Sequence, residues 1–183
     1  GQGGFRGEGR LNEHAANYVI IYEDGSEECI PVHRRLQVGM YQSETKLVLE
    51  IKPSGVSKQR SLLTADKSFA LVKELGIEDK SIYISFDYDI LKKILEVSPA
   101  ALTHYLNGDK TPAQLKADGI TGADYHYTVF KKNPGWINDA RKNGIVLNAW
   151  TVNSTADFDW LMAHDFDFIT TDEPESLFSR LKT

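Results

Sequence analysis

Lys46-Leu47-Val48-Leu49-Glu50-Ile51-Lys52 is an apolar run that ends in charged residues and is followed at once by Pro53. Such a run is typical of a buried parallel strand whose last residues emerge at one edge of the sheet. Glu50 and Lys52 are two residues apart, so on a strand their side chains point to the same side. The stretch therefore predicts a strand that carries a carboxylate and an ammonium group together at its tip.

Strand and helix patterns alternate from this point to the end of the chain. The predicted strands are 46–52, 81–86, 101–106, 122–127, 145–152 and 168–171. The predicted helices are 62–75, 89–97, one that opens at 111–115, 134–143, 154–164 and one from 175. This alternation predicts parallel strands with right-handed crossovers, and hence an α/β barrel or an open doubly wound sheet.

The first part of the chain has a different texture. Five of the first ten residues are glycine, which indicates a flexible lead-in. The β-branched and aromatic run 18–22 and the shorter run 29–32 flank an Asp-Gly turn signal at 23–26, so we expect a β-hairpin. The chain is therefore divided into a glycine-rich lead with a hairpin at 1–41 and an α/β portion at 42–183.

The bulk properties exclude several classes of protein. No apolar run is long enough to cross a bilayer, so no membrane span is expected. The formal net charge of -5 disfavours a nucleic-acid partner, because a polyanion is held mainly by clustered Lys and Arg. Cys29 is the one cysteine of the sequence, which excludes an intramolecular disulfide and leaves the compartment open.

Three strand motifs together carry a family resemblance. In their order and separations, 47–52, 148–153 and 169–174 resemble strands three, seven and eight of the glycerophosphodiester phosphodiesterase family, and 83–86 and 105–108 lie where that family has strands four and five. The resemblance covers residues 42–183, and the lead and hairpin at 1–41 are expected to be foreign to the family. It implies a TIM-type (β/α) barrel that is incomplete, with about six of the eight β/α units present.

The resemblance also implies a site at the carboxyl ends of the strands. Glu50 matches the family's metal-ligating carboxylate, Lys52 matches the lysine that faces the phosphate, and Trp150 matches the aromatic wall of the substrate pocket. The implied cofactor is a divalent cation, Mg²⁺ or Ca²⁺. His126, between two tyrosines on a predicted strand, is either a hydrogen-bonded wall residue or a second substrate-binding residue.

The implied reaction belongs to lipid metabolism and hydrolyses a glycerophosphodiester to glycerol 3-phosphate and an alcohol. A phosphodiester is a stable anion, so its hydrolysis needs charge neutralisation by a hard cation and a fixed ammonium group. The family's His-Arg-Gly and Glu-x-Asp motifs are not recognisable, and His33-Arg34-Arg35 is the most similar stretch. No catalytic residue is therefore assigned, and impaired activity is expected of this chain. His104 has no partner visible in the sequence and is expected at the surface, and Asp89 is expected to cap a helix.

Two alternatives remain open. Six strands leave two open edges, so the chain can instead be a catalytically silent barrel remnant that binds a ligand or partner, with a homo-oligomer covering the edges. A lyase that cyclises the diester without adding water is the other alternative.

Overall fold

The computed structural model describes residues 14–21, 27–33 and 46–181, and the chain divides into two compact units between Thr45 and Lys46. The first unit contains strands β1 (His14–Ile21) and β2 (Glu27–His33), which pair antiparallel. The predicted hairpin is therefore confirmed, with both strands longer than expected. The predicted turn at 23–26 and the glycine-rich lead lie outside the described residues.

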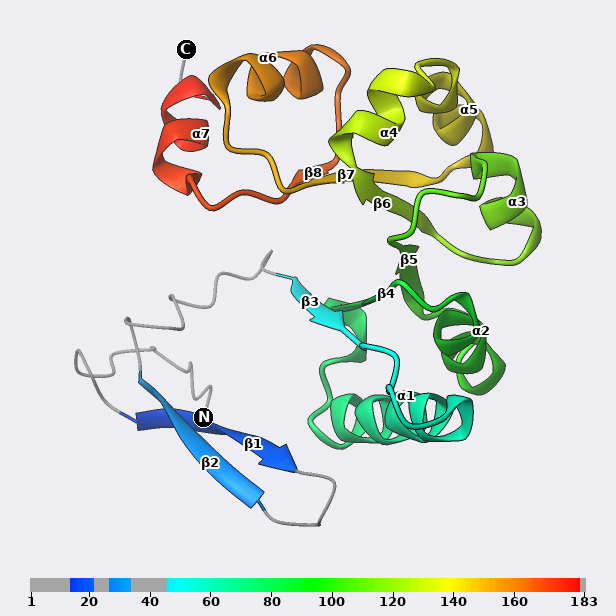
Figure 1. Cartoon of the computed structure of the whole chain (residues 1–183), viewed down its shortest axis with the longest axis vertical. Coiled ribbons are helices and arrows are strands. Elements are labelled where there is room, and N and C mark those ends of the chain that lie inside the picture. The colour runs from blue at the N-terminus through cyan, green and yellow to red at the C-terminus, as the bar shows by residue number, and fades with distance from the viewer. Residues whose placement is uncertain (1–13, 22–26, 34–45, 182–183) are drawn as a thin grey trace, which may run out of the picture. The chain divides into compact units, whose positions relative to one another are not determined.

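The second unit is built on one parallel sheet of six strands. Its strands are β3 (Leu47–Glu50), β4 (Ser81–Ser85), β5 (Leu102–Tyr105), β6 (Gly122–His126), β7 (Val146–Trp150) and β8 (Phe168–Ile169). Their order in the sheet is their order in the sequence, and each neighbouring pair is parallel. Figure 1 shows the strands in an arc with the helices around its outer side. The predicted incomplete TIM-type α/β barrel is confirmed as a half-barrel.

Helices connect the strands and follow the last one. They are α1 (Lys58–Glu74), α2 (Tyr88–Val97), α3 (Pro112–Ala117), α4 (Tyr127–Lys132), α5 (Gly135–Asn143), α6 (Thr155–Ala163) and α7 (Pro174–Leu181), with a 3₁₀ turn η1 (Glu78–Lys80) before β4.

Most helix ends follow the predicted capping signals. Thr111 caps α3 in a reciprocal capping box with Gln114, and Gly144 ends α5 in the left-handed conformation at φ 65°. The prediction for α2 is wrong by two residues. Asp87 is its N-cap, and the Asp87 side chain accepts a hydrogen bond from the backbone N–H of Asp89 at 3.0 Å.

The pleat of the strands separates two faces of the sheet. Tyr83, Tyr105, Tyr125 and Leu147 point towards the helices and are at most 4% exposed. They belong to two apolar clusters that hold the helices onto the sheet. Because side chains alternate along a strand, their neighbours in sequence point to the inner face of the arc. Glu50, whose neighbour Leu49 packs in the helix-side cluster, also lies on this inner face.

The inner face is tightly packed near the middle of the arc. His104 on β5 is only 2% exposed, so the expectation that it lies at the surface is wrong. Its ring lies over Gly122, the residue opposite it on β6. A Cβ built on Gly122 would lie 2.2 Å from the ring carbon Cδ2 of His104, so this close approach requires glycine.

No helix among the described residues is long and apolar enough to cross a membrane.

Candidate functional site

A cavity of about 550 Å³ opens at the carboxyl ends of the strands, and each of the six strands or the residues just after it contributes to its lining. Glu50 is the last residue of β3, Trp150 is the last residue of β7, and Lys52, Phe86 and Thr170 follow the ends of β3, β4 and β8. Parallel strands bring these ends to one edge of the sheet. The polar groups predicted at separate strand tips therefore share one cavity.

Glu50 and Lys52 lie on the same side of the chain, as their spacing predicts. The residue between them, Ile51, is buried in the apolar cluster on the helix side, and its backbone N–H donates to the carbonyl of Ile84 at 2.9 Å. The Lys52 Nζ atom lies 3.9 Å from the Glu50 carboxylate, and the two side chains are 78% and 34% exposed. An exposed pair at this distance contributes little to stability, so both groups can turn to a ligand.

Trp150 forms a fixed wall of the cavity. Its indole N–H donates to the backbone carbonyl of Asp124 at 2.8 Å. Phe86 and His126 both meet its ring edge to face, with ring centroids 5.6 Å and 5.3 Å away. The hydrogen bond and the two ring contacts restrain the indole plane, as an aromatic binding surface requires.

His126 lies beside Trp150, and it is absent from the described residues that line the cavity. Its side chain accepts from the backbone N–H of Thr128 as the N-cap of α4, and its Nδ1 atom lies 2.7 Å from the Thr128 hydroxyl. The structure thus brings together Glu50, Lys52 and Trp150 and sets His126 behind them.

Asp124 is the ionisable residue among those described around the cavity that sequence reasoning missed. It is 2% exposed, and its Oδ1 atom has no hydrogen-bond partner. Burial raises the pKa of its carboxyl to about 7, hydrogen bonding from Asn148 opposes this shift, and the charge of Glu50 adds to it. The signal in the sequence was a carboxylate at the centre of the strand 122–126, at a position that alternation assigns to the inner face.

The carboxylates of the cavity can hold only part of a cation's coordination shell. The described residues contain no group of three or more His, Cys, Asp or Glu side chains placed to hold a metal ion. The cavity does bring Glu50 and the unpartnered oxygen of Asp124 to one space. Mg²⁺ is commonly bound by one or two carboxylates and keeps several waters or substrate oxygens, so this donor set fits a hydrated hard cation.

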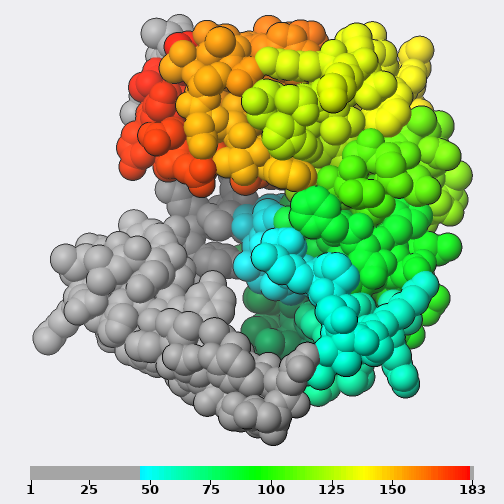
Figure 2. Space-filling model, in the orientation of Figure 1, coloured from blue at the N-terminus to red at the C-terminus, as the bar shows by residue number. Residues whose placement is uncertain are grey.

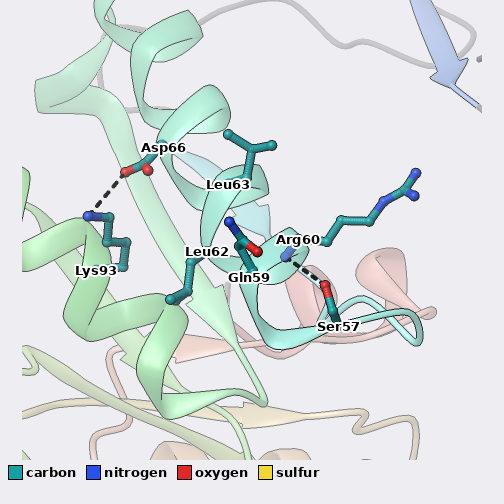
Figure 3. Close-up of a pocket in the computed structure, with 7 residues that line it drawn as sticks. All are labelled: Ser57, Gln59, Arg60, Leu62, Leu63, Asp66 and Lys93. Atoms are coloured by element: carbon teal, nitrogen blue, oxygen red, sulfur yellow. Dashed lines mark hydrogen bonds and ion pairs between the residues drawn. The ribbon is translucent and has the colours of Figure 1, made fainter.

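A second cavity, of about 420 Å³, lies beside the first turns of α1 and is a weaker candidate (Figure 3). Three of the polar side chains that line it, those of Ser57, Asp66 and Lys93, already have structural partners. Ser57 accepts from the backbone N–H of Arg60 as the N-cap of α1, and Lys93 lies 3.8 Å from Asp66. The Arg60 side chain points away from this ion pair. The Asp66 carboxylate of this cavity is therefore already paired, whereas the Asp124 carboxylate of the cavity at the strand ends has an unpartnered oxygen.

The fold and the cavity define a parallel α/β half-barrel with its polar groups at the carboxyl ends of the strands, which is the arrangement of TIM-barrel enzymes. Residues 27–176 match the model of the glycerophosphoryl diester phosphodiesterase family, and the chain belongs to this family. The match begins at Glu27, the first residue of β2, so it includes residues 27–41, which were expected to be foreign to the family.

Individual relatives agree with this assignment. A glycerophosphodiester phosphodiesterase structure from Parabacteroides distasonis is 35% identical, with a TM-score of 0.72 over 75% of this chain and 57% of that chain. A curated glycerophosphodiester phosphodiesterase from Caldanaerobacter subterraneus is 26% identical over 119 residues, which are 64% of this chain and 49% of the relative. The chain thus spans about half the length of the curated relative it matches.

A more distant structure shares the fold. A phosphodiesterase from Oleispira antarctica, solved with its product sn-glycerol 3-phosphate, is 20% identical with a TM-score of 0.63, over 75% of this chain and 56% of that chain.

Proposed function

We propose that this chain is the catalytic-barrel portion of a metal-assisted phosphodiesterase that converts glycerophosphodiesters to glycerol 3-phosphate and an alcohol. The observation that carries the proposal is the convergence of Glu50, Lys52 and Trp150 on one cavity at the strand ends of a chain from this family. The product bound to the Oleispira relative supports the substrate class.

Each of these residues has a role that its chemistry supports. Lys52, 78% exposed and only loosely paired with Glu50, binds a non-bridging oxygen of the phosphodiester anion. Glu50 would hold the divalent cation, which when bound supplies charge neutralisation at the phosphate. Trp150 orients the glycerol portion against a fixed aromatic surface. His126 contributes to substrate binding either by holding the Trp150 ring in place or by contacting the substrate itself. A direct contact would use its Nε2 atom, because Nδ1 faces Thr128.

The release of glycerol 3-phosphate from glycerophosphocholine, measured with Mg²⁺ or Ca²⁺ and again with EDTA, tests this function. We expect turnover that EDTA abolishes, and a reduced turnover with a raised KM in Lys52→Met. Lys92→Met, an exposed lysine on the outer helix α2, is the matched control and should match the wild type. Metal-independent turnover, or none at all, would sink the proposal, and a cyclic phosphate product would assign the chain to the lyases instead.

A second function is favoured by the exposed apolar inner face. Val48, Phe86 and Phe168 are 46%, 42% and 39% exposed, on or beside the strands of the arc. A catalytically silent barrel remnant would use this face to bind a ligand or partner, including a second copy of the chain. Binding of glycerophosphocholine without turnover would favour this alternative.

A further inference from the structure

We propose that Asp124 is a second carboxylate ligand of the divalent cation and holds it together with Glu50 inside the cavity. This inference rests on the proposed function for the existence of a cation site. It adds to that function a cation ligand on β6, which is three strands away from β3 in the sheet.

The unpartnered oxygen of Asp124 points to a ligand. A buried polar atom without a partner destabilises the folded state, and native proteins keep few of them. Asp124 is 2% exposed, its Oδ1 atom has no hydrogen-bond partner, and the residue lines the cavity that Glu50 also lines. Carboxylate oxygens are the ligands that hard divalent cations prefer. A bound cation therefore satisfies an atom that the fold otherwise leaves unsatisfied.

Neighbouring groups hold this carboxylate in position. Asn148 lies directly opposite Asp124 on β7, and its amide opposes the rise in the pKa of the Asp124 carboxyl group that burial causes. The amide of Asn148 is itself held by the Thr170 hydroxyl at 3.3 Å, and the Asp124 backbone carbonyl accepts from the indole of Trp150. Such supporting contacts fix the orientation of a metal ligand and are typical of metal sites.

The charge of the cavity also favours a cation. Among the described residues that line it, two carboxylates, Glu50 and Asp124, face the single ammonium group of Lys52. With both acids ionised the cavity carries an excess negative charge, which would repel an anionic phosphodiester. A dication bound by the two carboxylates reverses the sign of this charge and prepares the cavity for the phosphate.

The test is a titration of the full chain with Mg²⁺, Mn²⁺ or Ca²⁺ in the absence of substrate. Cation binding is measured by calorimetry and by tryptophan fluorescence. The indole of Trp150 is hydrogen-bonded to Asp124, so cation binding at Asp124 should change its emission. We expect Asp124→Asn and Glu50→Gln each to weaken cation binding about 10- to 100-fold. Asp139→Asn, an exposed acid on α5, is the matched control and should bind as the wild type does.

The double variant tests whether both acids bind one ion. Two ligands of the same ion lose less in combination than the sum of their separate losses. Circular dichroism establishes that each variant is folded, and Asp124→Ser is a second replacement if the asparagine variant is not. Wild-type affinity in a folded Asp124 variant, or no cation binding by the wild-type chain, would overturn the inference.

This titration separates the inference from the function on which it rests. Asp124-dependent cation binding without release of glycerol 3-phosphate would uphold the inference and refute the proposed function. Metal-dependent release with unchanged cation affinity in Asp124→Asn would uphold the function and refute the inference.

Discussion

Asp124 and His104 are two buried ionisable side chains on neighbouring strands, and burial shifts their pKa values in opposite senses. Burial raises the pKa of Asp124 to about 7 and lowers the pKa of His104 to about 4. Between pH 4 and 6.5 the folded chain binds an extra proton at Asp124, so this residue's contribution to stability falls as pH rises. At His104 the unfolded chain binds the extra proton, so that contribution rises with pH.

We therefore expect the two effects to offset each other in the wild-type chain. In EDTA, its free energy of unfolding should change little between pH 4.5 and 6.5. Asp124→Asn removes the Asp124 effect, so the His104 effect remains and the free energy of unfolding should rise by about 2–3 kcal/mol over this pH range. In His104→Gln only the Asp124 effect remains, and the free energy of unfolding should fall as pH rises. Urea unfolding at each pH measures these slopes.

The control for this experiment is an acid with no role in the inner face. Asp139→Asn should keep the flat wild-type profile. Asp157, whose pKa is lowered by hydrogen bonds from Lys131 and Ser154, titrates below this window and does not disturb it. Identical slopes in the wild type and Asp124→Asn would contradict the prediction.

At the scale of the element, the contact between β5 and β6 depends on Gly122. We expect Gly122→Ala to destabilise the chain by about 1–3 kcal/mol, because the new methyl group would overlap the buried ring of His104. Gly135→Ala is the matched control. No atom lies within 4 Å of a Cβ at Gly135, in the first turn of α5, so alanine there should be neutral or slightly stabilising. Chemical denaturation measures both changes.

The capping box of α3 gives a second prediction at this scale. Thr111→Ala removes the hydroxyl that accepts from the Gln114 backbone N–H, and should cost about 1 kcal/mol. Thr64→Ala removes a threonine hydroxyl that donates to the Arg60 carbonyl within α1, and should be neutral or slightly stabilising. Equal melting temperatures for the two variants would show that the cap contributes nothing.

The elements with strong periodicity were predictable from sequence, and the exceptions have local causes. Helix α4 was missed because Tyr127 follows the strand pattern of β6 without a turn signal, and its cap is the side chain of His126. The cap of α2 was placed on Asp89 because both Asp87 and Asp89 suit that position, and only the backbone conformation of Asp87 decides between them.

The candidate site was predictable where it depends on alternation and strand order. Glu50 and Lys52 share a side because they are two residues apart on a strand, and Trp150 joins them because parallel strands end at one edge. Alternation places Asp124 on the inner face, but the roles of Asp124 and His104 in that face were not predictable. What distinguishes them is burial and, for Asp124, an unpaired oxygen, and both depend on how distant strands pack.

At the scale of the whole molecule, β3 and β8 end the sheet, and in the described part of the chain each pairs with one strand only. An unpaired edge can add a strand from another copy. We expect the chain to associate as its concentration rises, and Leu47→Lys on β3 to weaken this association, because an edge lysine opposes strand addition. Size-exclusion chromatography with light scattering measures the mass.

The control for association is a lysine placed on an outer helix. Leu71, 55% exposed on α1, is distant from both ends of the sheet in sequence, and Leu71→Lys should leave the mass unchanged. A wild-type chain that stays monomeric at all concentrations would count against assembly through the edges.

The agreement between strand order and sequence order also bears on synthesis. From β4 to β8, each strand of the described six-stranded sheet pairs with the strand made just before it, as Ser81 does with Leu47 and Phe168 with Asn148. Loop closure within this sheet therefore spans one strand-to-strand connection at a time. Short closures carry a small entropic penalty and favour rapid folding. The sheet can therefore form during synthesis one β/α unit at a time, because each new strand pairs with a strand that has already been made.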